Sequence, residues 1–515
     1  MGEQILDAPT LWGLIEARAA ATPDVVMAVD EIGRELTFAD YRDQAEVAAA
    51  GLVAEYGIGA GDVITWQLPT WLESMVLVGA ISRLGATQNP VLPIYREREV
   101  GFCAGQAAAK LLAVPSDFAG FDFIAMADKI AGELSTESAP VLVMSSDRSL
   151  PAGDPSTLPP APTSGDDVRW LFYTSGTTAD PKGAQHTDRT IYAVAKGMGE
   201  RLAVTAADRN ALAFPFTHIG GITWLFTSMQ IGMSNILFEA FIPDVVVQVL
   251  SERGVTMAGS GTYFHQTYQA AQKAADHPIF PEVRNFPGGG APKPVELYWE
   301  MKDLFGAPIV SGYGLTEAPV LTMGAQDDLD EDLAETEGRA MPGVELKLVK
   351  LDGELAAQGE EGEVRAKAPQ LMLGYLDSSL DADAFDDEGF FHTGDLGMLN
   401  ERGMLTITGR LKDVIIRKGE NVSAKEVEDH LYRHPKVADV AVIGLPDADR
   451  GEMVCAVVAT ADGAEPITLP ELFTFLKDEG LMVQKIPEQL EIVDVIPRNP
   501  TGKILKNDLR KTYAP

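Results

Sequence analysis

Cysteine is scarce in this chain, and its scarcity excludes two common kinds of site. The 515 residues include only Cys103 and Cys455, and they contain no CxxC pair. A disulfide framework or a thiolate metal site is therefore not indicated. The seven histidines include no HExxH motif and no tight pair at ligand spacing, so a histidine-bound metal is not indicated either.

Positive charge is also scarce. The chain has 41 Lys and Arg residues against 76 Asp and Glu residues, which gives a formal net charge of −35. So large a negative charge argues against a nucleic-acid backbone or an anionic membrane as the main partner. Basic residues do gather near the C-terminus, at Lys412, Arg417, Lys418, Lys425, Arg498, Lys503, Lys506, Arg510 and Lys511. A charge run is usually a solvated face, so this cluster does not identify a ligand by itself.

Long apolar runs are absent except for one stretch. Residues 210–238 carry no charged side chain and are long enough to cross a bilayer. Pro215, His218, Gln230 and Asn235 interrupt the stretch, which argues against a lipid-facing helix. We expect a buried wall of an apolar pocket here and no transmembrane segment.

The N-terminus lacks the basic region and the apolar region of a signal peptide, so we expect a cytoplasmic protein.

Length and patterning predict an α/β protein of more than one domain. A chain of 515 residues is too long for one ordinary core. Short apolar strands alternate with amphipathic helices, which predicts α/β layers with a largely parallel sheet. The clearest elements are helices over residues 11–21, 38–55 and 71–84 and a strand over residues 63–68. We expect exposed loops over residues 147–167 and over the acidic stretch 327–337.

Residues 171–184, LFYTSGTTADPKGA, have the chemistry of a loop that grips a polyphosphate. Small residues let backbone N–H groups approach an anion, while hydroxyls and the ammonium of Lys182 add donors. The stretch is not a common P-loop, because Pro181 precedes the lysine and Gly183 follows it. A generic cluster of this composition would be a surface loop, so other motifs must decide.

Further motifs follow in order along the chain. They are GGGAP at 288–292, SGYGLTE at 311–317, EVRAKAPQLMLGY at 363–375, FHTGDL at 391–396, TGRLKD at 408–413, IIRKGENVSAKEVE at 415–428 and PRNPTGKILK at 497–506. A lone glycine cluster is usually a turn. The second motif ends in Glu317 where a dinucleotide fingerprint needs glycine, so a Rossmann interpretation fails.

This ordered set resembles the adenylate-forming superfamily, which comprises acyl-CoA synthetases, adenylation domains of peptide synthetases and luciferases. The resemblance spans nearly the whole chain, with one departure at Ala179, where the family usually has glycine. It implies a large N-terminal body of several subdomains with mixed and parallel sheets, over residues 1–410. It also implies a small, mobile α+β C-terminal domain over residues 411–515, with the hinge at Lys412.

The resemblance also implies a role for each motif. ATP is implied to contact Thr174, Ser175, Gly176, Thr177, Thr178, Lys182, Gly289, Gly290, Ala291, Tyr313, Gly314, Asp395 and Arg410. Mg²⁺ is implied at Glu317 and Thr178, and a hard carboxylate oxygen suits this ion. CoA is implied to meet Lys418, Gly419 and Glu420, and the catalytic residues are implied to be Lys503, Thr316, Glu317 and His218. The implied acyl pocket comprises His218, Gly221, Trp224, Phe264 and Gly312. Without the resemblance, a lone histidine would be a core residue more often than a site residue, and an aromatic pair at this spacing is equally often plain core.

The implied reaction has two halves. A carboxylate attacks the α-phosphorus of ATP to give an acyl adenylate and pyrophosphate, and the thiol of CoA then displaces AMP. Because two anions must meet in the first half, positive charge and alignment are needed most. Lys503 would bridge the carboxylate and the α-phosphate as a mobile point charge, and the C-terminal domain would then swing about the hinge.

Several alternatives stay open at this point. Residues 67–102 and 118–123 look most like the cyclohexanecarboxylate–CoA ligase branch, several members of which act on alicyclic or steroid side-chain acids; a medium- or long-chain fatty acid is the alternative substrate. A peptide-synthetase domain, a luciferase and a kinase fit the motifs less well. A non-catalytic nucleotide-binding regulator would commonly have lost one of Lys182, Glu317, Asp395 and Lys503, all of which are present. The sequence leaves the oligomeric state open, a homodimer included.

Overall fold

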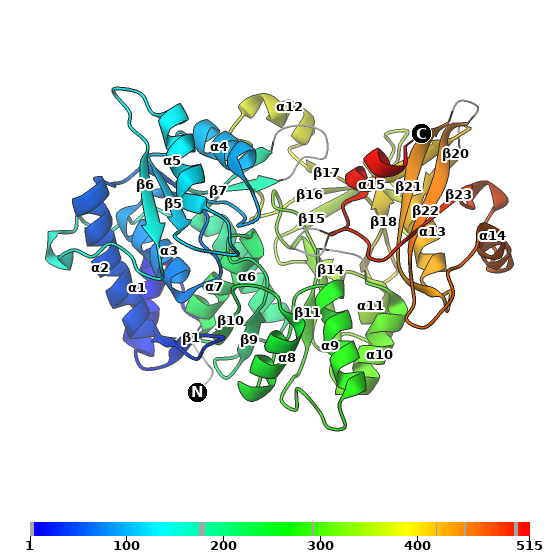
Figure 1. Ribbon diagram of the computed structural model, residues 1–515, viewed down its shortest axis with the longest axis horizontal. Coiled ribbons are helices and arrows are strands. Elements are labelled where there is room, and N and C mark those ends of the chain that lie inside the picture. The colour runs from blue at the N-terminus through cyan, green and yellow to red at the C-terminus, as the bar shows by residue number, and fades with distance from the viewer. Residues whose placement is uncertain are drawn as a thin grey trace.

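A computed structural model describes residues 5–174, 181–290, 293–418, 420–447, 450–498 and 503–514. Figure 1 shows a large body that contains the elements up to β18, with a smaller unit of the later elements beside it. Helices and parallel and antiparallel strands alternate through the body, so the predicted α/β class with mixed sheets is confirmed.

The first sheet carries the strand that leads into the predicted phosphate loop. Its order is β6 (Leu142–Ser146), β5 (Leu111–Pro115), β3 (Val63–Trp66), β4 (Thr87–Pro90), β7 (Val168–Thr174) and β8 (Lys182–Thr187). The pairs are parallel from β6 to β7, and β7 and β8 are antiparallel. Four helices belong to this part of the chain: α2 (Phe38–Tyr56), α3 (Leu72–Leu84), α4 (Glu97–Gln106) and α5 (Phe123–Leu134).

The second and third sheets are joined through the short segment around Met257. The second has the order β2 (Glu35–Thr37), β1 (Val26–Asp30), β10 (Ser234–Leu237) and β9 (Arg209–Leu212), and the third has the order β11 (Phe286–Gly288), β12 (Ile309–Tyr313), β13 (Thr322–Met323) and β14 (Arg339–Ala340). Met257 forms parallel bridges to Asn210 on one side and Asn285 on the other, so it links β9 to the start of β11. The accompanying helices are α1 (Leu11–Ala21), α6 (Asp188–Arg201), α7 (Ile219–Ile231), α8 (Pro243–Glu252), α9 (Thr262–Ala274), α10 (Val295–Phe305) and α11 (Asp330–Glu335).

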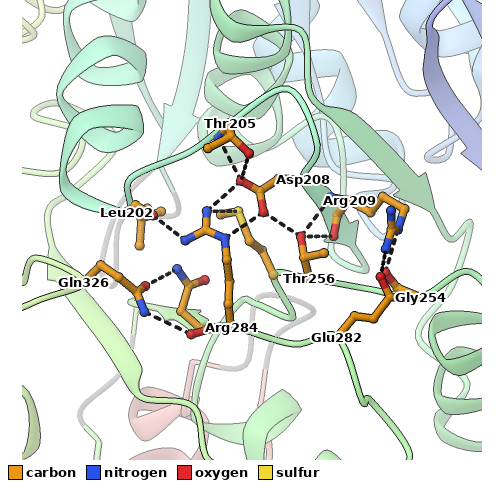
Figure 2. Close-up of polar contacts among 11 residues, drawn as sticks. Leu202, Thr205, Asp208, Arg209, Gly254, Thr256, Glu282, Arg284 and Gln326 are labelled. Atoms are coloured by element: carbon orange, nitrogen blue, oxygen red, sulfur yellow. Dashed lines mark hydrogen bonds and ion pairs between the residues drawn. The ribbon is translucent and has the colours of Figure 1, made fainter. Parts of the chain in front are cut away.

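An ion pair with a buried carboxylate reinforces this junction, as Figure 2 shows. Arg284 donates to both carboxylate oxygens of Asp208, from Nε and Nη2, each at 2.7 Å. The same carboxylate accepts from the backbone N–H of Thr205 and the hydroxyl of Thr256, each at 2.8 Å. Arg284 also donates to the carbonyl of Leu202, at the end of α6, at 2.8 Å. The junction therefore connects β9, α6 and the segments on both sides of Met257.

The remaining elements form two antiparallel-rich sheets. The fourth sheet has the order β15 (Glu345–Val349), β16 (Gly362–Lys367), β17 (Phe391–Leu399) and β18 (Leu405–Arg410), with α12 (Asp381–Ala384) nearby in the chain. The fifth has the order β20 (Glu420–Ser423), β19 (Val414–Arg417), β22 (Gly451–Thr460) and β21 (Val437–Asp447), and β23 (Gln489–Val493) pairs with β22. The helices that accompany the fifth sheet are α13 (Ala424–Leu431), α14 (Leu469–Asp478) and α15 (Lys506–Tyr513). Short 3₁₀ helices occur along the whole chain, at η1 (Pro155–Thr157), η2 (Ser378–Leu380), η3 (Leu411–Asp413) and η4 (Val483–Lys485).

The C-terminal unit buries hydrophobic cores of its own. One contains Val440, Val454 and Leu472, and a second contains Ile443, Cys455 and Leu509. All of their buried residues follow Ile415 or include it. Such separate burial is the property of a domain that could move as a unit, while the exact boundary at residue 410 stays a prediction.

Local sequence signals placed several elements correctly. Thr10 caps α1 by accepting from the Gly13 N–H at 3.0 Å, and Thr37 forms a capping box with Asp40 at the start of α2. The uncharged stretch 210–238 divides into β9, α7 and β10. No helix within the described ranges has the length and apolar character that a bilayer crossing requires.

The expectation of an exposed loop over residues 327–337 is wrong. This stretch contains α11, in which Asp332 and Leu333 are buried. Leu333 packs into the main core, and the Asp332 carboxylate accepts from Arg402 Nε at 2.9 Å. The acidic composition suggested solvent exposure because the partner of Asp332 is 70 residues away in the chain.

Candidate active site

A cavity of about 400 Å³ lies between the body and the C-terminal unit. Elements far apart in the sequence meet around it. Its lining includes Gly290, Gly312, Tyr313, Gly314, Glu337, Asp395, Arg410, Lys412, Lys425, Glu428, Lys503 and Lys506. Five of the residues predicted to bind ATP therefore line the same cavity as the predicted catalytic lysine.

The body contributes a wall built around Asp395. This residue lies on β17 opposite Arg410 of β18, and its side chain is buried. One carboxylate oxygen pairs with Arg410 Nε at 2.8 Å, and the other accepts from the hydroxyl of Tyr313 at 2.7 Å. Burial, with the Asp395 charge beside it, raises the pKa of Tyr313 well above its ordinary value, so the phenol stays a donor. A carboxylate offers about four acceptor positions, so Asp395 retains capacity for further hydroxyl donors.

The strands on either side of the predicted phosphate loop are firmly anchored. Thr174 ends β7 and lies opposite Lys182, the first residue of β8. The indole N–H of Trp170 in β7 donates to the buried carboxylate of Asp188 at 2.8 Å, and that carboxylate also accepts from the Leu11 N–H at 2.9 Å. Residues 175–180 lie outside the described part, and with them Ser175, Gly176, Thr177, Thr178 and the unusual Ala179.

Glu317 and Lys182 meet at one aromatic side chain. Glu317 is 8% exposed, and its Oε1 accepts from the hydroxyl of Tyr375 at 2.9 Å. The ammonium of Lys182 lies over the ring of the same tyrosine, 5.2 Å from its centroid. Thr316 is fixed through its backbone, because its carbonyl oxygen accepts from Nε2 of the buried His186 at 2.9 Å.

Lys503 supplies a cation to the cavity from the C-terminal unit. Burial, together with the charges of Arg410 and Lys412, lowers the pKa of Lys503 to about 8, although Asp395 and Asp413 oppose the shift. These are the same residues that line the cavity on the body side and at η3. The terminal segment thus reaches the wall built around Asp395, as the predicted reaction requires.

The predicted CoA-facing residues do not line this cavity in the described part of the chain. Lys418 is exposed in the turn between β19 and β20, with φ of +51°. Gly419 and the side chain of Glu420 lie outside the described residues. The same unit directs Lys425, Lys503 and Lys506 to the cavity instead. The role of Lys418, Gly419 and Glu420 in the second half-reaction stays a prediction.

Most of the residues predicted for the acyl pocket do not line this cavity. Gly312 does, whereas His218, Gly221, Trp224 and Phe264 are not among its described lining residues. His218 caps the start of α7, and its Nδ1 accepts from the Gly220 N–H at 3.1 Å. Burial lowers the pKa of His218 to about 4, so the ring is neutral near pH 7. Gly221 packs closely, because an added Cβ would lie 2.7 Å from the Phe216 carbonyl oxygen.

Comparison with known proteins identifies the family. The chain matches the model of the AMP-binding enzyme over residues 15–376 and that of the AMP-binding enzyme C-terminal domain over residues 426–503. The chain belongs to the AMP-binding enzyme family. The resemblance to adenylate-forming enzymes that the motifs indicated is therefore confirmed.

Relatives match this AMP-binding enzyme over almost its full length. It is 32% identical to the medium-chain fatty-acid–CoA ligase of Escherichia coli K12, over 97% of this chain and 91% of the relative. It is also 32% identical to the 3-[(3aS,4S,7aS)-7a-methyl-1,5-dioxo-octahydro-1H-inden-4-yl]propanoyl:CoA ligase of Rhodococcus jostii RHA1, over 98% and 99%. Among solved structures, ATP-bound MatB from Rhodopseudomonas palustris aligns with a TM-score of 0.87 and 26% identity, over 98% and 99% of the two chains.

Residues without a role in the sequence-based prediction also contribute to the AMP-binding enzyme's site, among them His186 and Tyr375. His186 supports Thr316, and it lies on the same face of β8 as Lys182, since strand residues four apart share a face. Tyr375 contacts both Lys182 and Glu317, although it closes a motif that was recognised without a role. Strand periodicity could have indicated His186, whereas the position of Tyr375 depends on pairing with a distant strand.

The donor set fits the magnesium ion that the family implies. Glu317 offers a nearly buried carboxylate, and among the described residues no donor contacts its second oxygen. Hard oxygen ligands of this kind suit Mg²⁺, which usually keeps waters and phosphate oxygens as its other ligands. Thr178, the other predicted ligand, lies outside the described residues.

Proposed function

We propose that this AMP-binding enzyme is an acid–CoA ligase that activates a hydrophobic carboxylic acid with ATP and transfers the acyl group to CoA. The observation that carries the proposal is the common cavity of Lys503 and the Tyr313–Asp395–Arg410 wall. The C-terminal unit places the ammonium of Lys503 opposite the wall that would bind the nucleotide. A carboxylate and a phosphate repel each other, so the attack of one on the other needs a cation at this place.

In the first half-reaction, the carboxylate oxygen attacks the α-phosphorus and pyrophosphate leaves. The acid is already ionised, so no general base is needed. Asp395 would accept from the ribose hydroxyls while Arg410 and Tyr313 hold it in place. Lys503 would lie between the incoming carboxylate and the α-phosphate and offset their repulsion. Thr174 and Lys182 would hold the departing pyrophosphate, and Mg²⁺ bound at Glu317 would neutralise its charge.

In the second half-reaction, the CoA thiol attacks the acyl carbonyl and AMP leaves. The cavity in the present structure is lined by Lys503 and not by Lys418, which matches the adenylating arrangement. A rotation about η3 would exchange these two sides of the C-terminal unit. The separate hydrophobic cores of this unit support such a rotation.

The proposed acid is alicyclic or a steroid side-chain acid, and a medium- or long-chain fatty acid is the alternative. The buried, uncharged α7 and the buried Trp224 and Phe264 support an apolar pocket. Both substrate classes have a relative at the same identity: one is named for medium-chain fatty acids, and the other for a propanoate on an octahydroindene ring. Sequence identity therefore does not choose between them.

The test is ATP–pyrophosphate exchange with a panel of alicyclic, steroid side-chain, medium-chain and long-chain acids, followed by CoA-dependent AMP release. We expect acid-dependent exchange and a thioester product with one class. Binding of ATP without exchange for any acid would favour the nucleotide-binding regulator. Exchange without CoA-dependent AMP release would indicate a different acyl acceptor.

A further inference from the structure

Lys182 and Glu317 share a contact through Tyr375. A cation and a carboxylate contact different parts of one phenol, the ring face and the hydroxyl. They do not form an ion pair with each other, and Lys182 forms none with any other residue in the described ranges. Two opposite charges near one another would ordinarily attract and pair.

Tyr375 is held rigidly enough to keep them separate. Its side chain is 4% exposed, and its backbone forms a bridge with Ala184 of β8. Its N–H donates to Asp381 Oδ1 at 2.8 Å, and its carbonyl accepts from Gln185 Nε2 at 2.9 Å. Both polar groups of the backbone are therefore fixed beside the strand that carries Lys182, while burial and the hydrogen bond to Glu317 restrain the ring.

We propose that Tyr375 is a positioning residue that prevents Lys182 and Glu317 from neutralising each other, so that the ammonium stays available to the triphosphate and the carboxylate to its metal ion. The proposal rests on the proposed function, because it assigns the two groups to a magnesium–ATP complex. The ring acts as a spacer on the lysine side, and the hydroxyl orients the carboxylate on the other.

The two parts of the side chain have separable consequences. Tyr375→Phe keeps the ring and removes one hydrogen bond to a charged acceptor, which should weaken only the magnesium side. Tyr375→Leu removes the ring as well, and the freed Lys182 should then pair with Glu317. That pairing should weaken ATP binding even without metal, since the lysine is no longer available to the phosphates.

Calorimetric titration of ATP into the full chain, with EDTA or with a range of Mg²⁺ concentrations, separates these effects. For Tyr375→Phe we expect about a five- to tenfold higher Mg²⁺ concentration for half-saturation, with unchanged metal-free ATP binding. For Tyr375→Leu we expect about tenfold weaker metal-free ATP binding. The double variant Tyr375→Leu/Glu317→Gln should recover metal-free binding, because the competing anion is gone.

A matched control exists in the same body. The hydroxyl of Tyr298 donates to Asp330 Oδ1 at 2.6 Å, and Lys293 Nζ lies 5.9 Å from the centroid of its ring. Tyr298→Phe removes the same kind of bond from a similar trio, and we expect it to leave the Mg²⁺ requirement unchanged.

The outcomes distinguish the inference from the proposed function. Recovery in the double variant supports the inference, whereas equal weakness of the single and double variants would show a merely structural ring and overturn it. Equal Mg²⁺ shifts in Tyr375→Phe and Tyr298→Phe would overturn it too. If either overturning result is found while the unmodified chain binds ATP and activates an acid, only the inference about Tyr375 fails. If the unmodified chain binds no ATP, the proposed function fails as well.

Discussion

At the scale of single residues, Lys503 is the group on which the proposed chemistry depends most. Its ammonium interacts with the charges of Arg410, Lys412, Asp395 and Asp413, in the cavity where the proposed reaction would bring an acid and a phosphate together. We expect Lys503→Ala to slow adenylation by about 10²–10³, the usual cost of one lost electrostatic donor. Thioester formation from supplied acyl adenylate should be largely retained. Equal losses in both half-reactions would contradict the assignment.

The same lysine predicts a pH dependence. Burial, with Arg410 and Lys412 nearby, lowers the pKa of Lys503 to about 8, and the lysine carries its charge below that pH. The kcat/KM for adenylation, which reports the free enzyme, should therefore fall as pH rises through about 8. Pyrophosphate exchange at low ATP concentration measures it. In Lys503→Arg the side chain keeps its positive charge over this pH range, so the kcat/KM of the variant should not fall near pH 8. If the variant shows the same pH profile as the unmodified chain, another group causes the fall.

At the scale of elements, the Asp208–Arg284 pair should decide how well the second and third sheets stay joined. Asp208→Asn leaves the partly buried guanidinium of Arg284 without its anion, and the loss should lie below the about 3–5 kcal/mol of fully buried pairs because that guanidinium keeps some contact with water. Thermal unfolding at neutral pH should show a clearly lower Tm. The exposed pair Arg189–Asp166 is the control, because Asp166→Asn should change stability by less than about 1 kcal/mol.

The pH dependence of that loss has a definite sign. Burial alone would raise the pKa of Asp208, but hydrogen bonds from Arg284, Thr205 and Thr256 outweigh burial and lower it below 3.8. A carboxyl with a depressed folded-state pKa stabilises the fold above its unfolded value and loses this effect as pH falls through the folded value. The Tm deficit of Asp208→Asn should thus be full above pH 3.8 and shrink below it. A deficit independent of pH would show that packing, not charge, is lost.

Elements with local signals could be predicted from the sequence, and those fixed by distant partners could not. The capping box of Thr37 and Asp40 lies within four residues, and it gave the start of α2 correctly. The burial of α11 depends on Arg402, and the position of Tyr375 depends on β8, so neither is visible in a short window. Motif order found part of the cavity lining, such as Asp395 and Lys503, but gave no role to Glu337. The link through Met257 had no motif at all.

At the scale of the whole molecule, η3 is the proposed hinge for a rotation of the C-terminal unit. Lys412 lies in η3 between β18 and β19, and the next residue, Asp413, pairs with Arg510 of α15 at 2.7 Å. Lys412→Pro restricts the backbone there, so we expect it to slow thioester formation much more than adenylation. Stopped-flow release of AMP and pyrophosphate separates the two. Lys412→Ala removes the same ammonium without restricting φ, so an equal effect of both variants would contradict a hinge.

The net charge of −35 poses a last question, because ATP is an anion. The described lining of the cavity has eight basic side chains and six acidic ones, so its local balance is opposite to that of the chain. Near physiological ionic strength, charges more than about 8 Å away are largely screened, and the local balance should dominate. ATP binding should therefore weaken as salt increases, roughly two- to fivefold between about 0.05 and 0.3 M. Lys511→Gln at the exposed rim should reduce this slope, since it removes one of the local cations. Tighter binding at high salt would show instead that repulsion by the whole chain controls the approach of ATP.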